Sequence, residues 1–202
     1  MAQALSSSPT LLGLFRSKSA SVGVASTIVT VVLGTLFLAL CAKIQVPVWP
    51  VPVTLQGFAV AAIAAAFGLR IGVATVAAYL LEGALGLPVF AAGGGLAYFV
   101  GPTGGFLVGF LIMAAIVGYA ADRGASSKPL VLFGAMLVGD AALLAFGFAW
   151  LLALSGSAGW IDPSNPVASA FAGAIQPFIV WDILKMALAS VTVAGAWRLA
   201  SR

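Results

Sequence analysis

An acid and a base stand three positions apart in an otherwise apolar segment of this chain. Asp182 and Lys185 lie in the stretch IQPFIVWDILKMALAS at positions 175–190. Residues three apart on a helix project to the same side, so the carboxylate and the ammonium would face one cavity. Each charge costs about 2.5–3.5 kcal/mol at the centre of a bilayer, and mutual pairing offsets only part of that cost. The pair is therefore either a structural salt bridge or part of a ligand site.

Three further polar side chains are expected in the same outer layer. Glu82 lies near the outer end of a predicted third helix, Tyr79 about one turn below it, and Gln56 in the first turn of a second helix. Polar groups that converge beneath loops rich in Pro, Gly and aromatic residues are typical of a small-molecule pocket with a lid. Local roles remain open: Gln56 as a partner of loop backbone, Tyr79 as an interfacial anchor and Glu82 as a neutral, packed side chain.

Asp140 is a separate acid in the middle of a predicted fifth helix. It has no evident partner, which favours a hydrogen bond between helices over a ligand contact. An intramembrane aspartyl enzyme would need two acids that face each other at equal depth. We expect Asp140 near mid-membrane and Asp182 nearer the outside, which argues against such a pair.

The composition excludes several kinds of site. The chain has no histidine and one cysteine, so disulfides, Cys/His metal sites and nucleophiles activated by histidine are ruled out. The nine Lys and Arg residues are scattered, which does not indicate nucleic-acid binding. The glycine-rich loop FAAGGGLAYFVGPTGGF lacks a GxxxxGK[ST] pattern, so the chain is not expected to hydrolyse ATP, and no cofactor is indicated.

The elements that position these residues belong in a bilayer. The 202 residues are 62% hydrophobic and 7% charged, and the mean hydropathy is +1.18, which predicts an all-α, polytopic integral membrane protein. The predicted spanning helices cover about 21–42, 54–67, 71–86, 106–121, 129–154 and 176–199. We expect the prolines of QVPVWPVPV to impose extended or turn conformations after the first helix, GLR to form a tight turn, and a short helix to lie between the last two spans.

Basic residues predict the orientation of the six spans. Residues 1–20 are expected to form a cytoplasmic N-terminal segment, and residues 21–202 a single six-helix transmembrane substrate-binding domain. Lys43 alone falls on the side opposite the termini. The terminal side carries Arg16, Lys18, Arg70, Arg123, Lys128, Arg198 and Arg202. The positive-inside rule therefore predicts that both termini are cytoplasmic.

Four motifs in the sequence resemble one known family. VPVWPVPVTLQGFAV, YLLEGALGLPVFA, GPTGGFLVGF and QPFIVWDILKMALA together resemble the BioY family, the biotin-specific substrate-binding (S) components of energy-coupling factor (ECF) transporters. The resemblance spans about residues 44–189 and implies a six-helix fold like that of an ECF S component. It also implies a bacterial inner-membrane protein that binds biotin from outside, in a pocket roofed by the loops after the first and third helices.

The resemblance also implies which residues meet the ligand. Asp182 would suit the N–H groups of the ureido ring and Lys185 the valerate carboxylate. We expect Glu82, Tyr79, Gln56 and Gly94 to belong to the same pocket, and for Glu82 three alternatives stay open: it is protonated, it binds the ureido group, or it lies just outside. Aromatic residues would face the apolar middle of biotin, namely Trp49, Phe90, Tyr98 and Trp181. The loop between the third and fourth helices carries no basic residue, so Lys185 is expected to be the single contact to the carboxylate.

The resemblance implies partners as well. A transmembrane coupling subunit and two ABC-type ATPases would energise uptake in the lipid bilayer. The alternative within transport is a stand-alone biotin carrier that works without an ATPase module. The alternative of a different class is the intramembrane aspartyl-type enzyme considered above.

Overall fold

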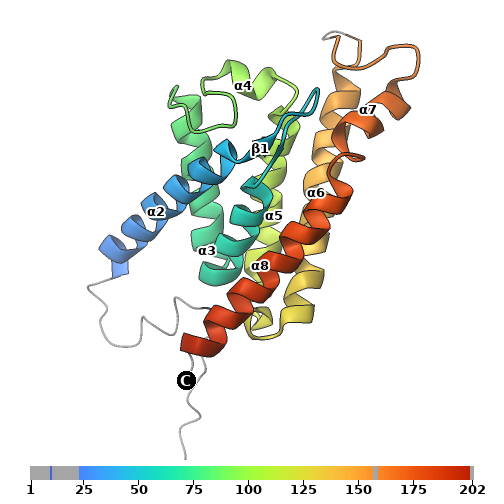
Figure 1. The fold of residues 1–202 in the computed structure, drawn as a ribbon. Coiled ribbons are helices and arrows are strands. Elements are labelled where there is room, and N and C mark those ends of the chain that lie inside the picture. Colours follow the sequence, from blue (N-terminus) through green and yellow to red (C-terminus); the bar gives the residue numbers. More distant parts are fainter. Residues whose placement is uncertain (1–9, 11–22, 157–158, 201–202) are drawn as a thin grey trace, which may run out of the picture.

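Long apolar helices form a bundle whose connecting segments gather at its two ends (Figure 1). The structure is a computed structural model that describes residue 10, residues 23–156 and residues 159–200. The predicted N-terminal segment 1–20 lies outside the described residues except for Thr10. The same holds for Arg16, Lys18 and Arg202, on which the predicted orientation partly rests.

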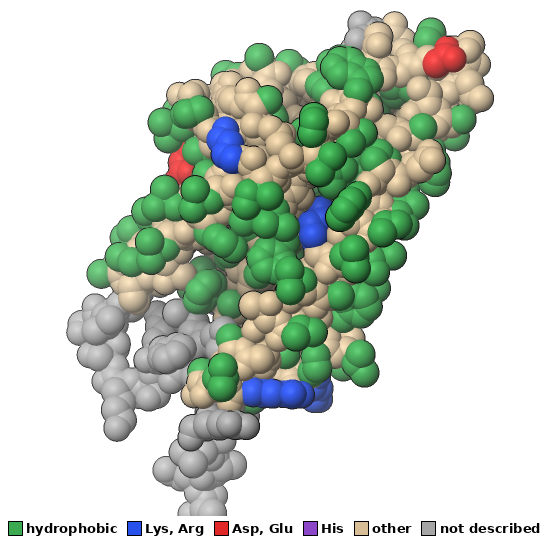
Figure 2. Space-filling model, in the orientation of Figure 1, with side chains coloured by type: hydrophobic (Ala, Val, Ile, Leu, Met, Phe, Trp, Pro, Cys, Tyr) green, Lys and Arg blue, Asp and Glu red, His purple; other side chains and the backbone are tan. Residues whose placement is uncertain are grey.

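The described elements follow the predicted order. They are α2 Gly23–Lys43, β1 Gln45–Val46, β2 Val53–Thr54, α3 Gln56–Ala84, α4 Ala97–Val100, α5 Gly104–Asp122, η2 Ala125–Ser127, α6 Pro129–Ala153, α7 Pro166–Ala174 and α8 Ile179–Ala200. Within the described ranges, five helical segments are long and apolar enough to cross a membrane. Hydrophobic side chains cover much of the face seen in Figure 2, where charged groups are few, as expected for a surface that meets lipid.

The helix α3 is a hairpin of two antiparallel halves. Gly68 breaks it with a φ of 82° and a ψ of −178°, a backbone conformation that glycine adopts readily. Gln56 Nε2 donates to Tyr79 OH at 2.8 Å although the two residues are 23 positions apart. A straight helix would separate them by about 34 Å at about 1.5 Å per residue. The two predicted helices around the GLR turn are therefore confirmed, and the described residues form six spanning segments.

Polar side chains from the next turn along the chain hold this hairpin at the end of the bundle where Gly68 lies, which we call the far end. Leu69 N donates to Asp122 Oδ2 at 3.1 Å, and Ser126 Oγ donates to Ala65 O at 2.7 Å. Backbone groups at helix ends lack partners within their own helix. Asp122 and Ser126 supply those partners on both sides of the turn.

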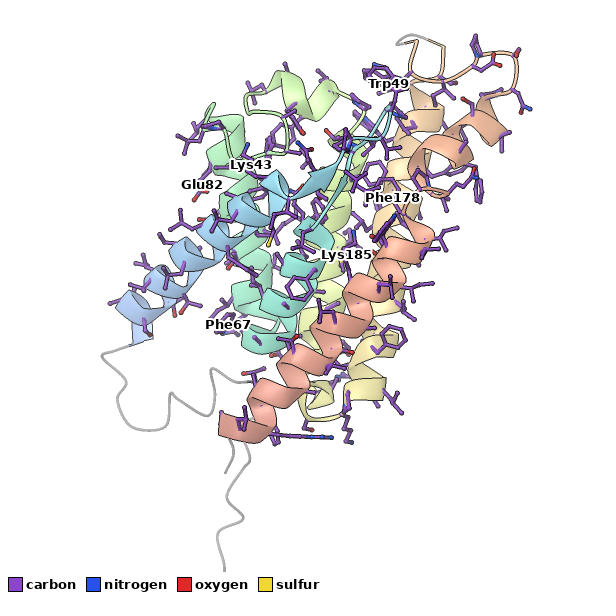
Figure 3. The ribbon with its side chains drawn as sticks, in the orientation of Figure 1. Lys43, Trp49, Phe67, Glu82, Phe178 and Lys185 are labelled. Carbon is purple, nitrogen blue, oxygen red and sulfur yellow. The ribbon has the colours of Figure 1, made fainter. Side chains whose placement is uncertain are left out.

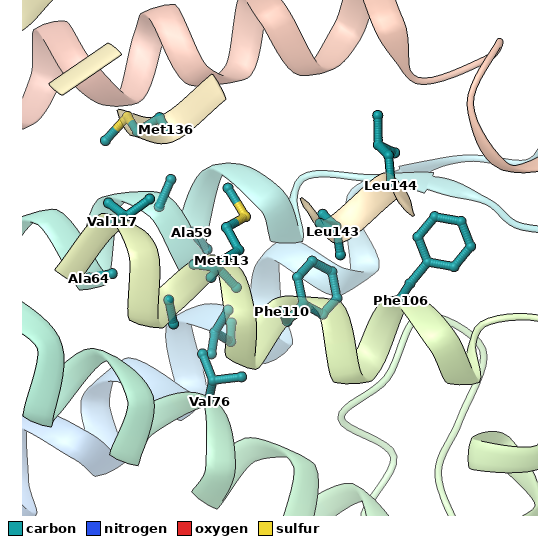
Figure 4. Packing of buried hydrophobic residues seen from close by; sticks show 14 of the residues in the cluster. Ala59, Ala64, Val76, Phe106, Phe110, Met113, Val117, Met136, Leu143 and Leu144 are labelled. Atoms are coloured by element: carbon teal, nitrogen blue, oxygen red, sulfur yellow. The ribbon is translucent and has the colours of Figure 1, made fainter. Parts of the chain in front are cut away.

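The core lies where α5 packs between α3 and α6, with α8 closing against α3 and α6. Figure 4 shows Met113 and Val117 of α5 between residues of α3 and α6. Gly109 of α5 lies so close to Leu143 of α6 that a methyl group would stand 2.9 Å from its Cα, and Gly118 approaches the Leu69 backbone similarly. Small residues thus bring the helices together, as predicted for packing in lipid. By contrast, α2 packs mainly on α3 and is the least buried of the long helices.

The opposite end, which we call the loop end, holds the connections expected to roof a pocket (Figure 1). The proline-rich segment folds as a short antiparallel hairpin that pairs Gln45 with Thr54 and Val46 with Val53, consistent with the predicted extended and turn conformations. The predicted short helix before the last span is α7. The last span itself starts at Ile179 rather than near 176, because residues 175–178 form a turn in which Phe178 N donates to Ile175 O at 3.0 Å.

Candidate functional site

A cavity opens at the loop end between α3, α5, α6 and α8. Its walls come from five separate parts of the chain, because the hairpin in α3 and the turns at the loop end bring them to one depth. Its lining residues are Val51, Pro52, Thr54, Gln56, Gly57, Phe90, Ala91, Tyr98, Thr103, Phe106, Leu107, Phe110, Leu143, Leu144, Phe178, Asp182 and Lys185. The lining is mostly apolar and aromatic, with a few polar groups, as in typical small-molecule sites.

The charged part of the cavity lies in the first two turns of α8. The Lys185 ammonium forms an ion pair with the Asp182 carboxylate, and their side chains are only 12% and 3% exposed. Lys185 Nζ also donates to the backbone oxygen of Thr54 at 2.9 Å, which ties α8 to the end of the β hairpin. Asp182 lies near the N-terminus of α8, where the helix dipole favours a negative charge.

A hydrogen-bonded chain of neutral groups continues the polar wall from Gln56 to the roof. Gln56 accepts from Thr54 Oγ1 at 3.0 Å and donates to Tyr79 OH at 2.8 Å. The hydroxyl of Tyr79 in turn donates to the backbone oxygen of Val89 at 2.9 Å. The amide of Gln56 is thus fixed on both sides, and Tyr79 connects the α3 wall to the loop that carries Phe90.

Two of the aromatic rings that line the cavity rest on glycines. A methyl group at Gly83 would collide with the ring of Phe90, and one at Gly147 would collide with the ring of Phe106. Phe90 also packs against Tyr98 with ring centroids 4.7 Å apart, and Phe106 against Phe178 at 5.5 Å. Because these glycines have no side chain, the two rings can sink into the helix surface and leave the cavity open between them.

The structure brings together five of the eight predicted site residues. Asp182, Lys185, Gln56 and Phe90 line the cavity, and Tyr79 is buried directly behind Gln56.

The other three predicted site residues do not line the cavity. Glu82 is half-buried and does not line the cavity, and in the view of Figure 3 it lies on the α2 side of the molecule. Trp181 is 54% exposed on the outer side of α8. The Gly94 backbone packs against the carbonyl of Leu87 within the loop. Of the two other aromatic residues expected to face the ligand, Tyr98 lines the cavity, whereas Trp49 is 73% exposed.

The expectation about Asp140 was wrong in one respect. Asp140 is buried on α6, and its carboxyl group lies close enough to Asp182 and Lys185 to interact electrostatically with both. The two acids therefore meet instead of lying at different depths, because α6 and α8 pack side by side at this level. Asp140 is not part of the cavity lining, as expected, and its hydrogen bond between helices stays a prediction.

Several lining residues had no distinctive signal in the sequence. Thr54 contributes through its backbone oxygen, which no residue type reveals. Apolar residues of α5, α6 and the turn before α8 form the rest of the wall, namely Phe106, Leu107, Phe110, Leu143, Leu144 and Phe178. Phe106 and Phe110 are four apart on α5, a spacing that marks one helix face but not which face meets a ligand.

The arrangement suits the capture of a molecule that has one hydrogen-bonding end and an apolar body. The ammonium of Lys185 can donate, the carboxylate of Asp182 can accept, and the Gln56 amide lies on the same wall. The aromatic remainder can enclose an apolar body. Within the described residues, no group of His, Cys, Asp and Glu side chains is arranged to hold a metal ion.

Comparisons with known proteins give a consistent result. A model described as the BioY family matches residues 13–202. The probable biotin transporter BioY of Pyrococcus horikoshii is 35% identical over 163 residues, which are 79% of this chain and 90% of that protein. The biotin transporter BioY of Thermotoga maritima is 34% identical over 169 residues, which are 78% and 87% of the two chains.

A solved structure has the same fold. The crystal structure of the S-component for biotin from an ECF-type ABC transporter matches 92% of this chain and 96% of its own, with a TM-score of 0.71 and 23% sequence identity. The six-helix architecture predicted from the sequence is therefore that of an ECF S component.

Proposed function

The chain belongs to the BioY family, and we propose that it binds biotin and is the substrate-specific component of an ECF-type biotin transporter. The relatives reported above are named biotin transporters, and the solved structure is named as a biotin S component. The multi-pass helical fold agrees with this role. A transporter component, and not an enzyme, is therefore the function supported for this chain.

The single observation that carries the proposal is the contact between Lys185 and Asp182 inside the aromatic cavity. The ureido ring of biotin presents one carbonyl oxygen flanked by two N–H groups. An ammonium beside a carboxylate offers the complementary pair, a donor for the oxygen and an acceptor for an N–H. Charge-assisted hydrogen bonds of this kind are about twice as strong as neutral ones.

The contact changes the assignment of Lys185. The sequence led us to expect Asp182 and Lys185 at the two polar ends of biotin, but two groups in contact meet the same end. We therefore assign both side chains to the ureido ring, with Gln56 beside them. The thioether ring and the valerate chain then lie along Phe90, Tyr98 and Phe106 toward the mouth of the cavity.

We assign the loop end to the outside of the membrane. Basic residues among the described ones concentrate at the far end, namely Arg70, Arg123, Lys128 and Arg198. The positive-inside rule makes that end cytoplasmic, with both termini on the same side of a bacterial inner membrane. Biotin would then enter from the outside, beneath the β hairpin and the loop after α3.

We assign the energy supply to partner subunits. The described residues form a cavity that can hold a ligand. The family resemblance implies that a coupling subunit and two ATPases supply the energy for uptake. A stand-alone carrier is the alternative. Uptake of labelled biotin is measured in a host that lacks the coupling subunit and the ATPases, with and without those genes restored. Uptake that depends on the restored genes supports the proposal, and normal uptake without them supports the stand-alone carrier.

Ligand binding is tested on the purified protein with biotin and 2-iminobiotin. In the protonated imino analogue a cationic group replaces the ureido carbonyl, so Lys185 loses its acceptor and meets a like charge. We expect the analogue to bind at least 100-fold more weakly, about 3 kcal/mol, and Lys185→Met to narrow that difference. No binding of biotin to the wild-type protein would refute the function. Discrimination that is unchanged in Lys185→Met would refute the assignment of Lys185 to the ureido ring.

A further inference from the structure

Three consecutive backbone carbonyls over the cavity are each held by a side chain from a different element. Tyr79 OH of α3 donates to Val89 O at 2.9 Å, and Lys43 Nζ of α2 donates to Phe90 O at 2.6 Å. Gln45 Nε2 of β1 donates to Ala91 O at 3.4 Å. We call residues 89–91 the roof segment, since Phe90 and Ala91 line the cavity.

The roof segment has little regular structure of its own. Residues 85–96 contain three glycines with positive φ, Gly86 at 96°, Gly93 at 140° and Gly95 at 99°. Glycine in this region gives a loop wide conformational freedom in the absence of other restraints. Backbone bonds close a tight turn between Phe90 and Gly93 and tie Gly95 N to Gly83 O at 2.6 Å. The three side-chain donors then help to fix the position of the turn relative to the cavity, together with the hydrogen bond from Ala92 N to Tyr98 OH at 3.4 Å and the packing of Phe90 on Tyr98.

Lys43 is the charged member of this set. It is the last residue of α2, it is exposed on its outer side, and it is not part of the cavity lining. Among the described basic residues, Lys43 and Lys185 are the two that lie away from the far end, and Lys185 is engaged with Asp182 and Thr54. A hydrogen bond from an ammonium to a carbonyl is stronger than one between neutral groups. Lys43 is therefore the strongest tie between the roof segment and α2.

Phe90 is the side chain that this tie controls. It is 1% exposed, its ring rests on Gly83, and it contacts Tyr79, Tyr98 and Phe99. Phe90 and Ala91 line the cavity, so a shift of this backbone would move that part of the cavity wall and open a path for a bound ligand. The backbone oxygen of Phe90 is the atom that accepts from Lys43.

We propose that Lys43, assisted by Gln45, is a positioning residue that holds the roof segment and Phe90 closed over a bound ligand. This rests on the proposed function only in taking biotin as the ligand. Lys43 acts through the backbone and not through contact with the ligand, so its removal speeds dissociation and leaves association nearly unchanged.

The test compares Lys43→Met with Lys43→Arg and with Lys128→Met, a change of an exposed base at the far end. Dissociation of biotin is followed by stopped-flow competition. We expect Lys43→Met to dissociate about tenfold faster, as fits the loss of one hydrogen bond to a charged group. Association should change by less than about twofold, Lys43→Arg should restore slow dissociation, and Lys128→Met should match the wild type.

Two further measurements separate this proposal from its rivals. Biotin carboxamide lacks the negative charge, so a loss in Lys43→Met that disappears with this ligand would overturn the proposal and make Lys43 a direct contact to the carboxylate. Hydrogen exchange of residues 90–96 in the ligand-free protein should accelerate in Lys43→Met and not in Lys128→Met. That measurement needs no biotin, so it tests the tie even if the proposed ligand is wrong. Unchanged exchange would overturn the proposal.

Discussion

Replacement of Lys185 by methionine tests the charged pair most directly. Methionine keeps most of the apolar stem of lysine and removes the ammonium. The change deletes the ion pair with Asp182 and the 2.9 Å hydrogen bond to the backbone oxygen of Thr54. It also removes the donor assigned to the ureido carbonyl, and it leaves the carboxylate of Asp182 without its cation.

The expected loss follows from the burial of the two side chains. Because they are only 12% and 3% exposed, solvent screens the pair weakly. Truncating one partner of a buried charge pair at a binding site costs about 2–5 kcal/mol. Because Lys185 keeps some contact with solvent, we expect a loss in the lower half of that range. We expect about 3 kcal/mol, which corresponds to a roughly 100-fold weaker dissociation constant for biotin.

The assay is a double-mutant cycle by calorimetry on detergent-purified protein. Lys185→Met, Asp182→Asn and the double variant are titrated with biotin, with Lys128→Met as the control. Each single change should weaken binding strongly, and the double variant should lose less than the sum by about 1–3 kcal/mol, since the charge stranded by either single change is then absent. Thermal melting without ligand shows whether each variant is folded.

Two results would refute the reasoning. If both single variants bind biotin within about threefold of the wild-type affinity, the pair is a structural salt bridge and not part of the ligand site. Strictly additive losses would mean that the two side chains act on separate parts of the ligand, contrary to their contact in the structure.

Three other changes test the surroundings of the site. Gly83→Ala should displace the ring of Phe90, which lowers biotin affinity and reduces the free energy of unfolding by about 1–3 kcal/mol through overpacking. The control is Gly134→Ala on α6, where a methyl group meets no atom within 4 Å, and it should not lower the melting temperature. Asp140→Asn should retain affinity within about threefold and Asp140→Leu should weaken it by about 1 kcal/mol, because only the amide can still hydrogen-bond Asp182; equal affinities would contradict a supporting role. Ser126→Ala should leave the buried Ala65 carbonyl unpaired and reduce stability by about 1–3 kcal/mol at unchanged affinity, and a melting temperature equal to that of the wild type would contradict the account of the far-end turn.

The sequence predicted the spanning helices because each depends on local properties. Long apolar runs separated by Gly and Pro residues predict α2, α5, α6 and both halves of α3. The spacing of three between Asp182 and Lys185 places both side chains on one face of a helix. The start of α8 was predicted about three residues early, because proline at position 177 suits either a helix start or the turn before it.

What the sequence could not supply was the relative rotation and depth of helices from different parts of the chain. Asp140 and Asp182 were expected at different depths, yet the packing of α6 on α8 brings them together. For the same reason, the sequence did not predict that Phe106 and Phe178 line the cavity. The hydrogen bond from Lys43 to Phe90 O joins residues 47 positions apart and involves a backbone atom, so no residue pattern indicates it.

The break in α3 at Gly68 links the position of the far end to the hydrogen bonds of the loop end. The segment from Gln56 to Phe67 is a rod of 12 residues, about 18 Å long at 1.5 Å per residue. If it pivots at Gly68 by about 10°, its tip swings by about 3 Å, which exceeds what a hydrogen bond tolerates. The 2.8 Å hydrogen bond between Gln56 and Tyr79, at the loop end of this segment, would then break. A partner protein that contacts the Gly68 turn could therefore change the cavity at the loop end.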